Sequence, residues 1–247
     1  MAIERAAEAP PLAAAFSIRA TLSTSLAVFG RNLVPFLIIA VVVSLPYFIV
    51  QTWADYALAE GATAVPSLIV LGIQTITFGL LQAVLTYGTI QDLRGAPAGI
   101  AGSFKGGFAQ IHEVLGAALI YGLALGFATM LLIVPGILLY LRWWVFMPAM
   151  VIEKKKTGAS FDRSAQLTAG RRWAILGLAA IVFGGMFLLL MVAIVALPPD
   201  SRVGDILATL VAVLFNTFSS VVAAVGYYHL RVEKEGVIID DIAKVFD

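Results

Sequence analysis

Few side chains in this sequence could carry out chemistry. It contains no cysteine, which excludes thiolate metal ligands and a cysteine nucleophile, and it has only two histidines, His112 and His229. Two histidines without further ligands make a poor metal site, so we interpret both as polar anchors at the membrane edge. No nucleophile, base and orienting group can be assembled within reach of one another. We therefore expect no catalytic residue, metal or cofactor, and we predict that the protein is not an enzyme.

Arg142 is the most informative charged residue, because it lies inside an apolar run that is long enough to cross a membrane. A guanidinium at the centre of a span costs roughly 2.5 kcal/mol or more, so it should face the helix bundle or a wet cavity. Gln74 and Asn216 lie at compatible depths and could accept its hydrogen bonds. We predict a buried polar cluster of Arg142, Gln74 and Asn216, and we prefer a structural role for it. The alternative is that Arg142 attracts an anionic lipid headgroup or substrate.

A basic segment follows this apolar run. Its cations are Lys154, Lys155, Lys156, Arg163, Arg171 and Arg172. Cations next to a span can bind anionic lipid at about 1 kcal/mol per charge, or they can act only as determinants of topology. Both interpretations remain open from the sequence, and we take all six residues as candidate contacts for anionic lipid.

The elements that position these residues are membrane-spanning helices. The chain is 61% hydrophobic and 13% charged, whereas a soluble domain has about 25% charged residues. The net charge of +1 gives no basic surface for nucleic acid. We predict an all-α membrane protein with six transmembrane helices. The predicted spans are Leu33–Trp53, Val65–Ile90, Ile111–Val134, Gly136–Ile152, Trp173–Leu197 and Gly204–Tyr228.

The positions of the basic residues predict the orientation of these spans. Fourteen of the sixteen lysines and arginines fall on one side, Arg202 falls on the other, and Arg142 lies within a span. Because cytoplasmic loops carry the excess of lysine and arginine, both termini should be cytoplasmic. We expect a multi-pass protein of the bacterial cytoplasmic (inner) membrane.

Two local patterns refine this scheme. Pro135 and Gly136 interrupt an apolar run and predict a turn, so that one helix ends near Val134. Residues 14–32 have apolar side chains at three- and four-residue spacing, which predicts an amphipathic helix. This helix could lie in the membrane interface or pack as a cytosolic helix on the loops of the protein.

The chain also shows a pattern that we interpret as an internal repeat; the alternative is that shared constraints at the membrane interface produce similar segments without common structure. Similar polar segments precede the first, third and fifth spans, and each pair of spans ends with charged residues and glycine. We predict a single domain of three parallel repeats, each an interfacial helix followed by a helical hairpin. The predicted units are residues 14–95, 96–158 and 159–236, preceded by an N-terminal tail at 1–13 and followed by a C-terminal cytoplasmic helix at 237–247.

Three groups of residues resemble a known bacterial membrane family. They are Val134-Pro135-Gly136-Ile137 with Arg142-Trp143, Pro148 and Glu153; Arg163-Ser164, Leu167-Thr168, Gly170 and Arg172 to Gly177; and Tyr227 to Arg231 with Glu235-Gly236. The family contains the membrane domain attached to some glycerophosphoryl diester phosphodiesterases, together with many stand-alone six-helix proteins. The resemblance covers nearly the whole chain and implies a six-helix integral membrane protein. It implies no established activity for stand-alone members, and the soluble phosphodiesterase barrel is absent from this sequence.

Two classes of function fit these expectations. The first is a non-enzymatic scaffold or assembly component whose partners are membrane lipids, including anionic ones, or another membrane protein. The alternative is a transporter or lipid-translocating protein with a path near Arg142. Transport favours broken helices and polar residues around a cavity at the membrane midplane. Since the predicted spans contain few polar groups, we prefer the first class.

Overall fold

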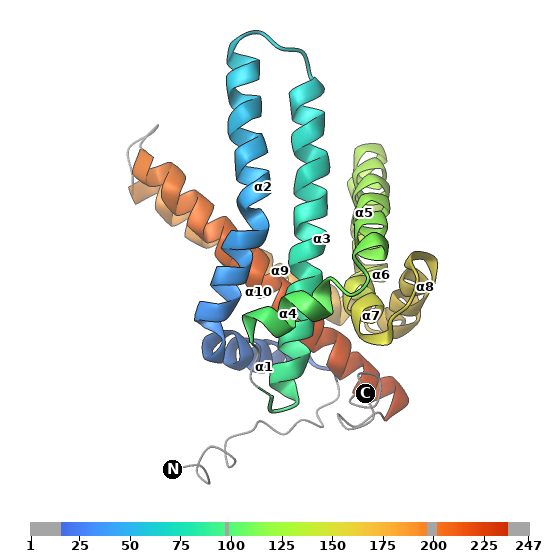
Figure 1. Cartoon of the computed structure of the whole chain (residues 1–247). Helices are drawn as coiled ribbons and strands as arrows, with labels where there is room; N and C mark the ends of the chain where they lie inside the picture. Colours follow the sequence, from blue (N-terminus) through green and yellow to red (C-terminus); the bar gives the residue numbers. More distant parts are fainter. Residues whose placement is uncertain (1–15, 97–98, 197–201, 237–247) are drawn as a thin grey trace.

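Helices make up the whole of the regular structure in the part of the chain that the computed structural model describes, which is residues 16–96, 99–196 and 202–236. They are α1 (Ile18–Arg31), α2 (Leu33–Ala59), α3 (Val65–Leu93), α4 (Ile100–Gly107), α5 (Ile111–Leu131), α6 (Ile133–Arg142), α7 (Phe146–Glu153), α8 (Thr157–Thr168), α9 (Arg172–Ala196) and α10 (Arg202–Glu235). Figure 1 shows their arrangement. The predicted tail at 1–13 and the predicted helix at 237–247 lie outside the described residues.

Six segments are long and apolar enough to cross a membrane, and they correspond to the six predicted spans. They are α2, α3, α5, the segment Ile133–Glu153 that contains α6 and α7, α9, and α10. The prediction of an all-α, six-span membrane protein is therefore confirmed. In each hairpin the helices fold back on one another, and the α2–α3 hairpin extends beyond the other two in Figure 1.

The turn between α5 and α6 is at Leu132, three residues before the predicted position. Leu132 has an extended backbone (φ −160°, ψ 143°), and Pro135 and Gly136 belong to the first turn of α6. Proline is tolerated in a first helical turn, where its missing N–H is not needed. A Cβ at position 136 would overlap the Thr129 side chain, so this glycine serves the close approach of α6 to α5 rather than the turn.

The fourth span is broken in the structure, whereas the sequence predicted one continuous helix from Gly136 to Ile152. α6 ends at Arg142 and α7 begins at Phe146. The break exposes backbone groups that an intact helix would satisfy, and α8 supplies their partners. Ser164 Oγ donates to Arg142 O (3.1 Å) and accepts from Val145 N (3.2 Å), and Thr168 Oγ1 also donates to Arg142 O (3.2 Å).

A short helix precedes each pair of long segments: α1 before α2 and α3, α4 before α5 and α6, and α8 before α9 and α10. α1 packs on α10, α4 on α3, and α8 on α7. The face of α1 that is buried carries Thr21, Thr24, Ser25 and Val28, while Leu26 is exposed. The helix therefore packs a mixed face of small polar side chains and Val28 on the protein, with Ile18, Leu22 and Phe29 partly buried beside it.

The best-packed core lies at the end of the bundle where the short helices gather. α3 is almost continuously buried from Leu81 to Ile90, α7 is buried from Phe146 to Ile152, and α10 is buried from Ser220 to Leu230. Toward the other end, the long helices separate and expose large apolar side chains, as expected of surfaces that face lipid. A cavity opens where this core stops.

Candidate functional site: a polar cavity within the bundle

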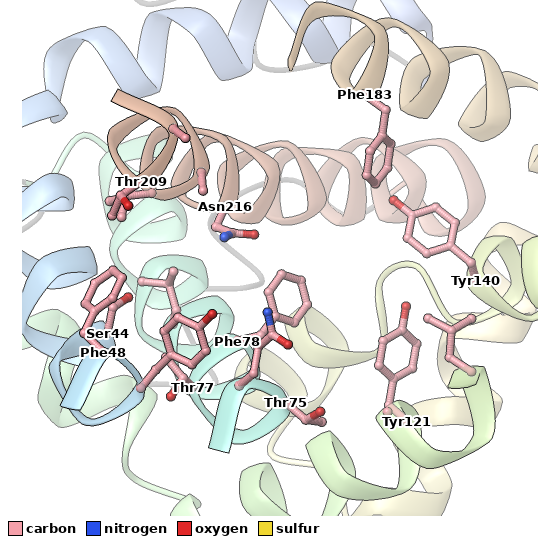
Figure 2. A pocket seen from close by; sticks show the side chains of 18 residues that line it. Ser44, Phe48, Thr75, Thr77, Phe78, Tyr121, Tyr140, Phe183, Thr209 and Asn216 are labelled. Carbon is pink, nitrogen blue, oxygen red and sulfur yellow. The ribbon is translucent and has the colours of Figure 1, made fainter. Parts of the chain in front are cut away.

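A cavity of about 630 Å³ lies between the spanning segments, bounded by α2, α3, α5, α6, α9 and α10. Its volume falls in the range of small-molecule sites. Figure 2 shows the side chains that surround it, with Asn216 and Thr209 on α10 and the hydroxyl groups of Tyr121 and Tyr140 on α5 and α6. The cavity is thus lined by residues from all six spans.

Uncharged polar groups distinguish this cavity from the surfaces that face lipid. Ser44, Gln74, Thr77 and Asn216 all contribute to its lining, and no acidic or basic side chain does so among the described residues. The side chains of these four residues form no hydrogen bond with any described residue. A polar group that is left unpaired in a low-dielectric site costs about 1–3 kcal/mol, so this set favours a bound polar partner or water.

Aromatic side chains form much of the rest of the wall. Tyr140 packs edge-on against Phe183 with the ring centroids 6.3 Å apart, and Tyr121 stacks on Phe146 at 4.7 Å. These contacts fix the two tyrosine rings that border the cavity. The space is therefore amphipathic, with rigid apolar walls and neutral polar groups, and it suits a ligand with the same two properties.

Close contact between α3 and α5 closes one side of the cavity. A Cβ on Gly122 would overlap the side chain of Thr75, and one on Gly79 would meet Ala118 Cβ at 2.5 Å. These two glycines therefore allow the backbones of the helices to approach each other. Gly126, one turn after Gly122, has open space around it.

The predicted cluster of Arg142, Gln74 and Asn216 is only partly formed. Gln74 and Asn216 line the same cavity, but Arg142 does not. The guanidinium of Arg142 is exposed and forms no hydrogen bond or ion pair within the described chain, while its backbone carbonyl accepts from Ser164 and Thr168. The prediction matched the three residues by depth alone, and depth does not determine which side of α6 faces the cavity. Tyr140 lines the cavity, and Arg142 lies two residues, or about 200°, further round the same helix.

A second group of polar residues is fully paired, and it joins α7, α8 and α10. Glu153 Oε1 accepts from Arg163 Nε and from the Tyr227 hydroxyl, each at 2.8 Å. Arg163 also pairs with Glu235, which accepts from Arg231 Nε at 3.0 Å. Burial lowers the pKa of Arg163, but the two carboxylates raise it by more, so the guanidinium stays charged. We call these five residues the ion-pair cluster.

The six candidate lipid contacts differ in how far they are engaged. Arg163 belongs to the ion-pair cluster, Lys155 lies 3.4 Å from Glu153, and Arg171 pairs with Glu233 at 2.6 Å. Lys156 is exposed, Lys154 lines a separate cavity, and Arg172 has a buried Nε without a hydrogen-bond partner in the described chain. At least three of the six, Lys155, Arg163 and Arg171, thus have carboxylate partners within the protein, which reduces their availability to lipid.

Other polar contacts in the same end of the bundle were not foreseen. Glu113 Oε2 accepts from the backbone N–H (2.9 Å) and hydroxyl (2.6 Å) of Thr157 at the start of α8. His229 is buried, and its Nδ1 lies 3.0 Å from Thr21 Oγ1 on α1. His112 is exposed. The signal available in the sequence was the position of Glu113 and His229 at span ends, but it did not reveal their partners.

The second half of the chain, from α5 onward, resembles a known protein family. Residues 111–229 match the family described as the membrane domain of glycerophosphoryl diester phosphodiesterase. This part of the chain is related to that membrane domain. The match is shorter than the predicted resemblance, which was expected over nearly the whole chain, and it covers somewhat less than half of the sequence. Comparisons with curated proteins and with solved structures gave no match.

The region related to the membrane domain begins with α5 and ends at His229 in α10. It includes the broken fourth span, α8 with its capping residues, and three members of the ion-pair cluster (Glu153, Arg163 and Tyr227). The α2 and α3 walls of the polar cavity lie outside it. The matched region thus contains the broken span, α8 and most of the ion-pair cluster, but only part of the lining of the polar cavity.

Proposed function

We propose that this chain is a non-enzymatic, multi-pass membrane protein that holds a membrane lipid in the polar cavity. The observation that carries this proposal is the set of unpaired neutral groups on Ser44, Gln74, Thr77 and Asn216. The glycerol and ester region of a lipid offers hydroxyl and carbonyl groups to such side chains, and its acyl chains suit the aromatic walls. The uncharged lining also supports a binding role, since the described residues around the cavity include no carboxylate, imidazole or amine to act as a general acid or base.

Native mass spectrometry of the protein purified in detergent tests this role. We expect the wild-type protein to retain lipid, and we expect the double variant Gln74→Leu/Asn216→Leu to retain at least fivefold less. The matched control is Gln51→Leu, because the Gln51 amide donates to Asp55 on the same helix and does not line the cavity. Equal retention by the wild-type protein and the double variant would reject the proposal.

Lipid translocation is the second candidate, and the broken fourth span favours it. Polar cavities and interrupted helices are typical of transporters. Because Arg142 does not line the cavity, a path through the cavity would not include it. We expect vesicles that contain the protein to move a fluorescent phospholipid no faster than protein-free vesicles. Faster movement that Asn216→Leu abolishes would establish translocation instead.

We also propose that the protein resides in the bacterial inner membrane with both termini in the cytoplasm. The excess of basic residues at one side supports this orientation, and so does a hydrogen bond from Phe16 N to Glu233 Oε2, which places the start of α1 beside the end of α10. The absence of native cysteine makes the test direct. Lys156→Cys should react with an impermeant reagent only after the cells are opened, and Leu132→Cys should react in intact cells.

The three-repeat organisation remains our proposal as well. The order of elements supports it, since a short helix precedes each pair of long segments. We assign α1, α4 and α8 to the membrane interface in the three units at 14–95, 96–158 and 159–236. Solid-state measurement of helix tilt would test this: α1, α4 and α8 should lie close to the membrane plane, and a steep tilt of α4 or α8 would remove the repeat.

A further inference from the structure

The deepest polar groups of the polar cavity lie near the middle of the membrane-spanning segments. Ser44 in α2, Thr77 in α3 and Asn216 in α10 are each eleven or more residues from both ends of their helix. At 1.5 Å per residue this separation is at least about 16 Å, which is about half the thickness of the hydrocarbon core of a bilayer. A ligand group that reaches these three side chains is therefore removed from the water on both sides of the membrane.

Two of these groups are hydroxyls that face the cavity. Ser44 and Thr77 are each only 9% exposed, and neither side chain has a hydrogen-bond partner in the described chain. Their oxygen atoms are not among the unpaired atoms that the described chain encloses completely, so they remain accessible from the cavity. Thr75 differs, because its hydroxyl donates to a backbone carbonyl one turn earlier in α3. Together with the Asn216 carboxamide, the two hydroxyls offer neutral donors and acceptors to a ligand.

The lining contains nothing that compensates a negative charge. No lysine, arginine or histidine contributes to it among the described residues. Arg142, the basic residue that the sequence places inside a span, does not line the cavity. A phosphate at this depth would lose its water without gaining a cation, whereas a hydroxyl or an ester carbonyl exchanges its water for hydrogen bonds with neutral side chains. The lining therefore favours an uncharged ligand head over a phosphate.

We propose that the polar cavity selects a lipid of the diacylglycerol type, whose head is a hydroxyl group, over lipids that carry a phosphate. This selectivity rests on the function proposed above, and it specifies which class of lipid the cavity holds. The hydroxyl and the two ester carbonyls of a diacylglycerol match the neutral donors and acceptors of Ser44, Thr77 and Asn216. Its acyl chains match the apolar part of the wall, where Figure 2 shows the rings of Phe48 and Phe78.

Native mass spectrometry in a non-ionic detergent tests this selectivity with two lipids that differ only in the phosphate, dioctanoylglycerol and dioctanoyl phosphatidic acid. Each lipid is added to the wild-type protein and to Asn216→Leu, and only the binding that the substitution removes is assigned to the cavity. We expect Asn216→Leu to lower the binding of dioctanoylglycerol at least fivefold and to leave that of phosphatidic acid within twofold. Thr77→Val keeps the shape of the side chain and removes only its hydroxyl, and it should give the same pattern.

Gln51→Leu is the matched control, because the Gln51 amide donates to Asp55 and does not line the cavity. It should change the binding of neither lipid by more than twofold. If Asn216→Leu and Thr77→Val lower the binding of phosphatidic acid as much as that of dioctanoylglycerol, or more, the cavity holds a phosphate head. The selectivity then fails, while the proposed lipid-binding function stands. If the two variants lower the binding of neither lipid, the selectivity and the proposed function both fail.

Discussion

The polar cavity and the ion-pair cluster both contain polar side chains on spanning segments, but they differ in whether these side chains have partners within the protein. In the ion-pair cluster, Glu153, Arg163 and Arg231 have partners within the chain. In the polar cavity, Gln74 and Asn216 have none among the described residues. Paired groups stabilise the fold, whereas unpaired groups cost stability and are free to bind a ligand.

This difference indicates that one end of the bundle stabilises the fold and that the other end is suited to ligand binding. The end that carries α1, α7 and α8 is held by buried side chains and charged contacts, while the helices beyond the polar cavity expose many large apolar side chains. A fixed end allows the open end to keep unsatisfied groups without unfolding. Substitutions at the two places should therefore change stability in opposite directions.

The largest effect should come from Glu153→Gln. It removes the carboxylate that pairs with Arg163 and accepts from Tyr227, and it leaves Glu235 as the only carboxylate of the cluster for two largely buried cations, Arg163 and Arg231. Breaking a buried pair in this way costs about 3 kcal/mol of unfolding free energy. Thermal unfolding in detergent, followed by tryptophan fluorescence, measures the loss. Asp55→Asn is the control, since Asp55 is exposed and should change stability little; equal losses in the two variants would contradict the role of the cluster.

Ser164→Ala and Thr168→Val should each cause a smaller loss of unfolding free energy. Both side chains donate to the Arg142 carbonyl at the break in the fourth span, and Ser164 also accepts from Val145 N. Each change should cost about 1–2 kcal/mol, and the double variant should cost more than the sum of the two, because in each single variant the remaining hydroxyl still donates to this carbonyl. Ser23→Ala, on the exposed side of α1, provides the control. Strict additivity would show that the two hydroxyl groups do not share this carbonyl.

The six spans could be predicted from the sequence because length and apolar composition alone decide whether a helix can cross a membrane. The break after Arg142 could not, since residues 133–152 are apolar throughout apart from Arg142 and Pro148 lies beyond the break. The groups that make the break possible, Ser164 and Thr168, lie about twenty residues later in α8. Their role depends on tertiary packing, which periodicity does not contain.

The polar sites were predictable to different degrees. Gln74 and Asn216 were identified because an amide inside an apolar run is conspicuous. Ser44 and Thr77 were not, since hydroxyl groups in spanning helices commonly bond to the carbonyl one turn earlier, as Thr75 does to Leu71 O (2.8 Å). The ion-pair cluster was missed because basic residues were assigned to sides of the membrane without pairing them with acids such as Glu153.

Asn216→Leu and Thr77→Val should have the opposite sign from Glu153→Gln. Neither side chain has a hydrogen-bond partner in the described chain, so an apolar replacement removes an unsatisfied group without leaving another. We expect the unfolding free energy to stay within about 0.5 kcal/mol of the wild-type value or to rise slightly. Thermal unfolding of lipid-free protein in detergent, followed by tryptophan fluorescence, tests this expectation. A loss of several kcal/mol would mean that these groups are paired in the protein, and the contrast between the two regions would disappear.

Arg31→Gln should have the smallest effect on stability, because it breaks an exposed ion pair and not one in the ion-pair cluster. Arg31 lies 2.6 Å from Asp92, but its side chain is 46% exposed, and Asn32 Nδ2 also donates to Asp92 Oδ1 at 2.8 Å. An exposed pair contributes about 0.5 kcal/mol or less, and salt screens it. We therefore expect a small loss of thermal stability at low salt that vanishes at high salt, while the loss in Glu153→Gln persists because its charges are shielded from solvent. If both variants respond to salt alike, burial does not distinguish the ion-pair cluster from a surface pair, and the stability of this end of the bundle must come from its apolar core.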